Sequence, residues 1–217
     1  MRARDIMLGQ WLKFLVVFFV VVEPVSLVPL FSGLTVGATR QYRRRMAFKA
    51  VAVSALILLL FALGGAAFLG LMGISLEAFR IFGGALLFLL ALDMVFARES
   101  GTRTSSDEAA ETRRRADISV FPLAFPFIAG PGALATLLLW FGPLHLGTQS
   151  ALFAALFGAV LLVLATALVL MLLADPLMRV IGVTGANVAS RLLGVILGAL
   201  AVQFVLDGLR QALGAPG

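Results

Sequence analysis

The sequence predicts an all-α membrane protein with six transmembrane helices, arranged as two inverted three-helix repeats in which helices 1 and 4 are broken near the midplane. Three observations predict this fold. Hydrophobic residues make up 61% of the 217 residues, and the mean hydropathy of +1.08 lies far above the range of soluble proteins. Long stretches without charge recur along the chain, and proline and glycine interrupt two of them at similar positions.

Six apolar stretches reach the length of about 20 residues that a helix needs to cross hydrocarbon. They cover residues 11–34, 49–71, 79–96, 120–141, 151–174 and 188–209. Between the third and fourth stretches, residues 98–117 mix charges of both signs with Ser and Thr, and contain no apolar side chain larger than alanine. Such a segment buries no core, so we expect a flexible cytoplasmic linker between a first repeat, residues 1–97, and a second, residues 118–217.

The positive charges lie in loops and favour one side of the membrane. If the spans alternate, one side receives the arginines and lysine of residues 40–49, those of residues 98–115, and Arg179. The loops around Gly73 and His145 on the other side lack both residue types. This asymmetry predicts that the Arg-rich loops are cytoplasmic and that both termini lie outside. A polybasic patch for lipid or nucleic acid is the weaker alternative, and we expect no nucleic-acid partner.

The first predicted span contains a glutamate and two prolines, in the segment "EPVSLVPLF". Proline lacks an amide donor and displaces the carbonyl four residues earlier, so Pro24 and Pro29 should free the carbonyls of Val20 and Val25. Unsatisfied backbone in lipid costs several kcal/mol per group, and a carboxyl at mid-span costs about 2.5 kcal/mol or more. The break at Glu23 is therefore expected to face the protein interior.

The fourth span has its own interruption, centred on Gly130-Pro131-Gly132. A half-helix that begins after such a break presents amide donors suited to a carboxylate, whereas exposed carbonyls suit an ammonium group. Two breaks at similar depth thus predict a site for a zwitterion such as an amino acid, where the repeats meet. The simpler interpretation, that proline only kinks packed helices, is favoured for one span alone but not for two matching breaks.

The two halves also resemble each other weakly. Aligning Arg80 with Arg191 also pairs Gly83 with Gly194, and a second alignment pairs Pro24 with Pro131. Because each half has three spans, the second copy must be inverted relative to the first. Inverted repeats with interrupted helices are typical of secondary transporters.

Other polar residues in the spans are secondary candidates. Asp93, near the cytoplasmic end of the third span, is a candidate for coupling or gating. Gln203 in the sixth span is expected to bond across helices or to line the cavity. Asn187 and Ser190 are candidates to cap the sixth span, and Arg80 is expected to extend its charge to the interface.

Four segments carry a resemblance to a known family. They are "EPVSLVPLFSGLT", "AFRIFGGALLFLLALDM", "PLAFPFIAGPGALAT" and "SRLLGVILGALAVQFVLDGL". In these segments the chain resembles the MarC family of bacterial and archaeal inner-membrane proteins, also called the neutral amino acid transporter family. The resemblance covers essentially the whole chain apart from the linker, and therefore implies a multi-pass protein of the bacterial inner membrane.

The family resemblance implies transport of small neutral amino acids such as alanine and glycine, by a fold of two inverted repeats. The implied binding positions are Pro24, Ser26, Pro29, Gly130, Pro131 and Gly132, to which the residue arguments add Glu23 and Gln203. The chain departs from the family in having Glu23 where Asp or Asn is usual, and Ser26-Leu27 where Gly-Asn is common. These departures bear on the size of the pocket and on ion coupling.

The favoured function is a secondary transporter working by alternating access, with Glu23 as the first candidate to couple transport to a proton or cation. A purely structural Glu23, protonated or bonded to backbone, is the competing interpretation. An enzyme is disfavoured because the chain has no cysteine, a single histidine and no GxSG or HExxH motif, and we expect neither cofactor nor metal. The alternative function is a non-transporting membrane protein, or an exporter of other small solutes that affects permeability or drug resistance.

Overall fold

The structure, a computed structural model, describes residues 3–96, 117–144 and 146–214. Apart from Asp117, the predicted linker lies outside these residues. Within the described ranges the chain is helical and has no strand. In order, the helices are α1 (Ala3–Val22), α2 (Leu27–Leu34), α3 (Arg40–Leu71), α4 (Leu76–Phe96), η1 (Ser119–Ile128), α6 (Pro131–Phe141), α7 (Leu146–Leu172) and α8 (Ala174–Ala212).

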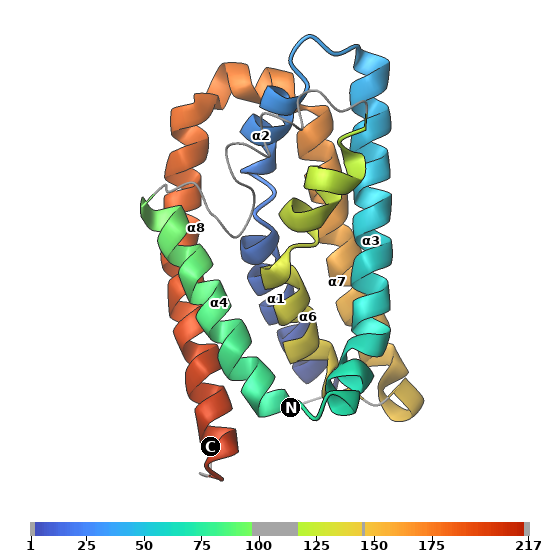
Figure 1. The fold of residues 1–217 in the computed structure, drawn as a ribbon, viewed down its shortest axis with the longest axis vertical. Helices are drawn as coiled ribbons and strands as arrows, with labels where there is room; N and C mark the ends of the chain where they lie inside the picture. The colour runs from blue at the N-terminus through green and yellow to red at the C-terminus, as the bar shows by residue number, and fades with distance from the viewer. Residues whose placement is uncertain (1–2, 97–116, 145, 215–217) are drawn as a thin grey trace.

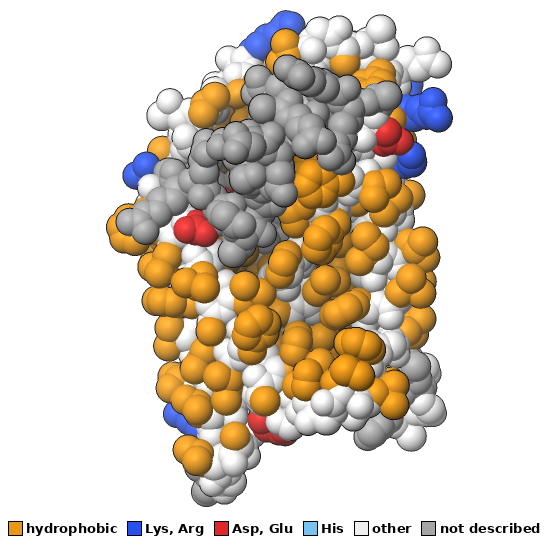
Figure 2. Space-filling model, viewed as in Figure 1, with side chains coloured by type: hydrophobic (Ala, Val, Ile, Leu, Met, Phe, Trp, Pro, Cys, Tyr) orange, Lys and Arg blue, Asp and Glu red, His pale blue; other side chains and the backbone are white. Residues whose placement is uncertain are grey.

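The described helices confirm the prediction of an all-α membrane protein. Five candidate spans are long and apolar enough to cross a bilayer, one of them the stretch Met7–Leu34 that includes α1 and α2. The count rises to six if η1 and α6, which are bent by 54° relative to each other, are taken as one span. Figure 2 shows a broad apolar surface over the helices of one face, with Lys and Arg side chains nearer the two ends.

The core of the bundle forms around α1 and α6. These two helices lie at the centre, with α4 and α8 on one side and α3 and α7 on the other (Figure 1). Phe14 and Phe18 of α1 are fully buried, and the Phe14 ring makes an edge contact with Phe141 of α6 at 5.7 Å between centroids. The last turns of α1, which lead into the first interruption, are therefore shielded by their neighbours, as an interrupted segment requires.

Glycines let α4 and α8 approach backbone to backbone. A Cβ built on Gly84 would lie 2.9 Å from the carbonyl oxygen of Ala201, and one built on Gly194 would lie 3.1 Å from that of Ala91. A Cβ on Gly208 would likewise lie 3.2 Å from the carbonyl oxygen of a residue on α4. Close approach of this kind is the usual way in which small residues promote helix association in membranes.

The last helix is longer than the predicted sixth span at residues 188–209. It begins at Ala174 and bends at Gly182, where φ is 63° and ψ is 177°. Glycine adopts this positive φ without the steric cost that a side chain imposes. Figure 1 shows the part before the bend lying across the end of the bundle, and the rest running down beside α4.

Two ion pairs join the elements at the end of the bundle opposite the chain termini. Arg43 pairs with Asp175 and thereby links α3 to α8, and Lys49 pairs with Asp117 just before η1. Asp117 also accepts the backbone N–H of Ser119 at 2.9 Å. The hydrogen bond from Lys49, with those from Ser119, lowers the pKa of Asp117 to about 2.

The contact between α4 and α8 gives a stability prediction. We expect Gly84→Ala to lower the free energy of unfolding by about 1–3 kcal/mol, because the new methyl group meets backbone atoms that have no room to give way. Gly64→Ala in α3 is the matched control, since a Cβ there has nothing within 4 Å. Thermal unfolding of both variants in detergent, followed by circular dichroism, checks this. Equal melting temperatures would contradict it.

Candidate functional site

The first interruption is a turn of four residues between α1 and α2. Glu23 has a φ of 53°, a left-handed conformation that is uncommon for a residue with a side chain. Its N–H donates to the carbonyl of Phe19 at 2.9 Å, and its carbonyl accepts the N–H of Ser26 at 3.1 Å. Pro24 follows it and is buried. The chain thus leaves the helix at Glu23 while retaining local hydrogen bonds.

The two prolines of this segment act differently, which corrects one expectation. The carbonyl of Val25 accepts the N–H of Val28 at 3.1 Å, so Pro29 does not leave it free. Pro29 is the third residue of α2, within the first turn, where amides have no partner in the helix and a missing N–H costs little. The interruption therefore belongs to Glu23 and Pro24, and Pro29 belongs to the helix that follows.

A small polar cluster occupies this turn. The side chain of Glu23 is buried, with 2% exposure, and its Oε1 accepts a hydrogen bond from the Ser26 hydroxyl at 2.5 Å. The hydroxyl of Ser190 on α8 donates to the same oxygen, and the two serine hydroxyl oxygens lie 2.6 Å apart. A buried carboxyl needs such partners, because losing hydration without replacement costs several kcal/mol. Carboxyl and hydroxyl oxygens together suit a proton or a hard cation.

The second interruption lies between η1 and α6. Phe121 and Phe125 each precede a proline, in cis peptide bonds, and have extended angles near φ −130° and ψ 130° inside η1. Gly130 then turns the chain, and a Cβ built on it would lie only 2.1 Å from the carbonyl oxygen of Pro126. Pro131 opens α6 at its first position, which tolerates proline. No residue larger than glycine fits at position 130 in this conformation.

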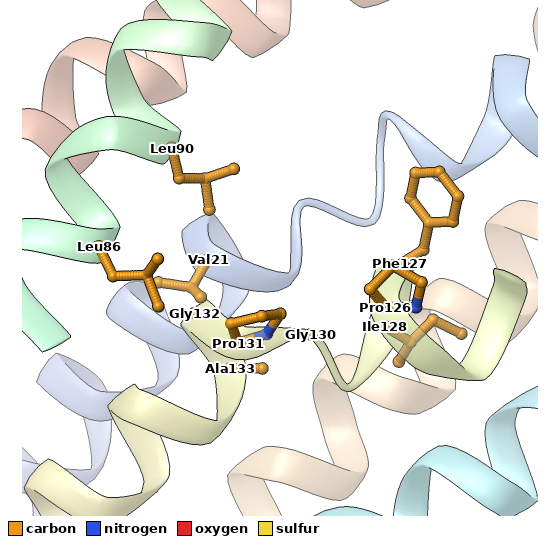
Figure 3. Close-up of a pocket in the computed structure, with 10 residues that line it drawn as sticks. All are labelled: Val21, Leu86, Leu90, Pro126, Phe127, Ile128, Gly130, Pro131, Gly132 and Ala133. Carbon is orange, nitrogen blue, oxygen red and sulfur yellow. The ribbon is translucent and has the colours of Figure 1, made fainter. Parts of the chain in front are cut away.

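A small cavity lies between the second interruption, the last turn of α1 and α4 (Figure 3). Gly130, Pro131 and Gly132 line it from the second interruption, Val21 lines it from α1, and Leu86 and Leu90 line it from α4. A Cβ built on Gly132 would lie 3.2 Å from the Val21 side chain, so the segments are in contact. The cavity has a volume of about 20 Å³, enough for about one water molecule.

The predicted site residues divide into those near the interruptions and those elsewhere. Glu23 and Ser26 share the polar cluster, and Gly130, Pro131 and Gly132 share the cavity. Asp93 is half-buried on α4, and the described lining of the cavity does not include it. Gln203 is exposed and donates to Asp207 of its own helix at 2.8 Å, which places it apart from the cluster.

Ser190 is the residue that the sequence argument missed. It lies within α8 and contacts Glu23, whereas it was expected to cap the sixth span. Its only signal in the sequence was a hydroxyl in an apolar stretch, and this signal does not reveal its partner. Within the described ranges, no three His, Asp or Glu side chains come close enough together to hold a metal ion.

Comparison with known proteins finds one family across most of the chain. The sequence profile described as "MarC family integral membrane protein" matches residues 8–213. A UPF0056 membrane protein of Aquifex aeolicus is 37% identical over 193 residues, which cover 89% of each chain. The UPF0056 membrane protein YhcE of Escherichia coli is 34% identical over 203 residues, covering 92% of each. One from Methanocaldococcus jannaschii is 34% identical, covering 88% of this chain and 82% of its own. No solved structure matches significantly.

The polar cluster gives a second prediction. We expect Ser190→Ala to lower the free energy of unfolding by about 1–3 kcal/mol, because the buried Glu23 carboxyl loses a donor from α8. Ser54→Ala is the control: Ser54 is fully buried, whereas Ser190 is half-buried, but the Ser54 hydroxyl donates to the Ala50 carbonyl of its own helix, at 2.8 Å. Thermal unfolding in detergent measures both. A smaller loss for Ser190→Ala than for Ser54→Ala would contradict the assigned role.

Proposed function

Because the chain belongs to the MarC family of integral membrane proteins, we propose that it is a secondary transporter of small neutral amino acids, of the size of alanine and glycine. It would move them across the bacterial inner membrane by alternating access. The observation that supports this proposal most is the contact between the two interrupted spans: Gly132, just after the second interruption, packs against Val21, two residues before the first, beside a cavity. Paired interruptions that meet inside the protein are the arrangement in which transporters hold substrate.

We further propose that residues 1–97 and 118–217 are inverted repeats, with both interruptions near the membrane midplane. The course of the chain supports this. The helices α1 and α2 run away from the end of the bundle that carries both termini, whereas η1 and α6 run toward that end (Figure 1). In the same proposal the end that carries Arg43 and Lys49 is cytoplasmic, and both chain termini are periplasmic.

The substrate would be held through its two charged groups. The first hydrogen bond of α6 runs from Leu134 N–H to the Gly130 carbonyl, so the amides of Gly132 and Ala133 have no acceptor within the helix. These amides and the helix dipole suit a carboxylate. The oxygens of Glu23 and Ser26 suit an ammonium group. A cavity of about 20 Å³ is too small for alanine, so binding requires η1 to move away from α1 and α4.

Glu23 is proposed to couple this movement to a proton or cation. Its Oε1 accepts hydrogen bonds from hydroxyls on two separate elements, the turn before α2 and α8. A proton or cation on that oxygen competes directly with the donors, because each occupies a lone pair that a hydroxyl now uses. Binding of a proton or cation to Glu23 therefore weakens the hydrogen bonds that join the first interruption to α8.

The alternative function is a non-transporting membrane protein, or an exporter of other small solutes that affects permeability or drug resistance. The observation in its favour is the small size and mainly aliphatic lining of the central cavity. We propose no catalytic activity, cofactor or nucleic-acid partner under either function. The partners are the lipid bilayer, the solute and a coupling ion.

Counterflow in liposomes tests the transport proposal. We expect Gly132→Val to reduce exchange of labelled alanine or glycine by about tenfold or more, because the new side chain meets Val21 and Leu87. A steric cost of about 1.4 kcal/mol weakens substrate binding by that factor. Gly158→Ala is the control, since a Cβ at that position of α7 has nothing within 4 Å. If the unmodified protein exchanges no amino acid, the alternative function stands instead.

Coupling at Glu23 has a separate test. We expect Glu23→Gln to abolish the pH dependence of amino acid accumulation in liposomes while counterflow continues, since the amide keeps the shape of the side chain but takes up no proton. Glu77→Gln, at a half-buried carboxyl in the first turn of α4, is the control. Full pH-dependent accumulation by Glu23→Gln would show that the coupling group lies elsewhere.

A further inference from the structure

A second, larger cavity lies near the end of the bundle that carries both chain termini. It has a volume of about 210 Å³, compared with about 20 Å³ for the central cavity. Its walls come from α4, α6 and α8, and are formed by Arg80, Leu139, Trp140, Phe204 and Asp207. None of these residues belongs to either interruption. The cavity is therefore distinct from the site described above.

Opposite charges line this cavity without pairing with each other. Arg80 and Asp207 are both half-buried, and in the described part of the chain no ion pair within 4.0 Å joins them. Asp207 Oδ1 accepts the Gln203 side-chain amide at 2.8 Å, one helical turn earlier on α8. Gln203 thus positions this carboxylate. A cation and an anion held apart on one cavity suit a ligand that carries both charges.

Trp140 supplies a second, independent observation. Its indole Nε1 is buried, and among the described residues it has no hydrogen-bond partner. A buried donor without an acceptor costs about 1–3 kcal/mol, so each such group needs an explanation. The indole ring is held in place by an edge contact with Phe14, whose ring centroid is 5.5 Å away. This unsatisfied donor belongs to a residue that also lines the cavity.

From these groups we propose that the cavity binds a small zwitterion. An anionic group of the ligand lies on Arg80, an ammonium group lies on Asp207, and the Trp140 ring forms part of the wall between them and α6. Two sources share this chemistry: a free amino acid and the headgroup of phosphatidylethanolamine. For a free amino acid the inference rests on the proposed function, and the cavity is a second binding site for the transported solute, near the end of the bundle that carries the termini. For the headgroup it is a lipid site independent of transport.

Trp140 fluorescence tests the proposal directly. Trp11 and Trp140 are the two tryptophans of the chain, so Trp11→Phe leaves Trp140 as the sole reporter. In phospholipid-free micelles, alanine and short-chain phosphatidylethanolamine are titrated separately. We expect a saturable change in emission with at least one of them, and binding weaker by about tenfold or more in both Arg80→Gln and Asp207→Asn. Propionate and ethylamine, which each carry one charge, are expected to bind comparably weakly.

The outcomes separate the ligand sources and the two sites. A response to alanine identifies the solute, and a response to the phospholipid alone identifies the headgroup; both uphold the site. No response to either ligand, or unchanged binding in both charge variants with native melting temperatures, overturns it. Gly132→Val should reduce counterflow by about tenfold or more and leave the Trp140 response intact. If counterflow is absent in the unmodified protein while the Trp140 response persists, the transport proposal fails and the zwitterion site remains.

Discussion

The hydrogen bonds from Ser26 and Ser190 to the Glu23 carboxyl are the constraint on which the central architecture depends. They satisfy an ionisable group that is 2% exposed inside an apolar bundle, and they join the interrupted first segment to α8. The left-handed backbone at Glu23 persists because the surrounding contacts hold it, as is common for strained residues at functional sites. Without the hydrogen bond from Ser190 to Glu23, this side-chain contact between the first interruption and α8 would be lost.

Steric restrictions on the backbone, rather than polar side-chain contacts, determine the shape of the second interruption. Residues before proline avoid the helical region, so Phe121 and Phe125 are extended, and Gly130 passes the Pro126 carbonyl where no Cβ fits. One interruption thus supplies a carboxyl and hydroxyls, and the other supplies backbone amides and the open space of glycine. The two interruptions therefore differ in chemistry: the first is held by side-chain hydrogen bonds, and the second by backbone geometry.

Sequence reasoning succeeded where the physical cause is local. The loss of an amide at Pro24 and the Gly130-Pro131 turn are properties of a few neighbouring residues, and α1 and η1 end beside them, at Val22 and Ile128. It failed where the answer depends on which way a helix faces. In uniformly apolar helices the periodicity of polar residues is too weak to set that rotation, so the partners of Ser190 and Gln203 were missed. The bend at Gly182 was missed because glycine is common in such helices.

The bend at Gly182 has a consequence for hydration. It lays the first residues of α8 over α2, and the pocket between them is lined only by apolar side chains and glycine, including Val25, Met178 and Ile181. Water loses hydrogen bonds on entering a pocket with such a lining, so the pocket disfavours hydration. The bend thus closes this end of the bundle with apolar contacts between α2 and the start of α8 rather than with polar ones.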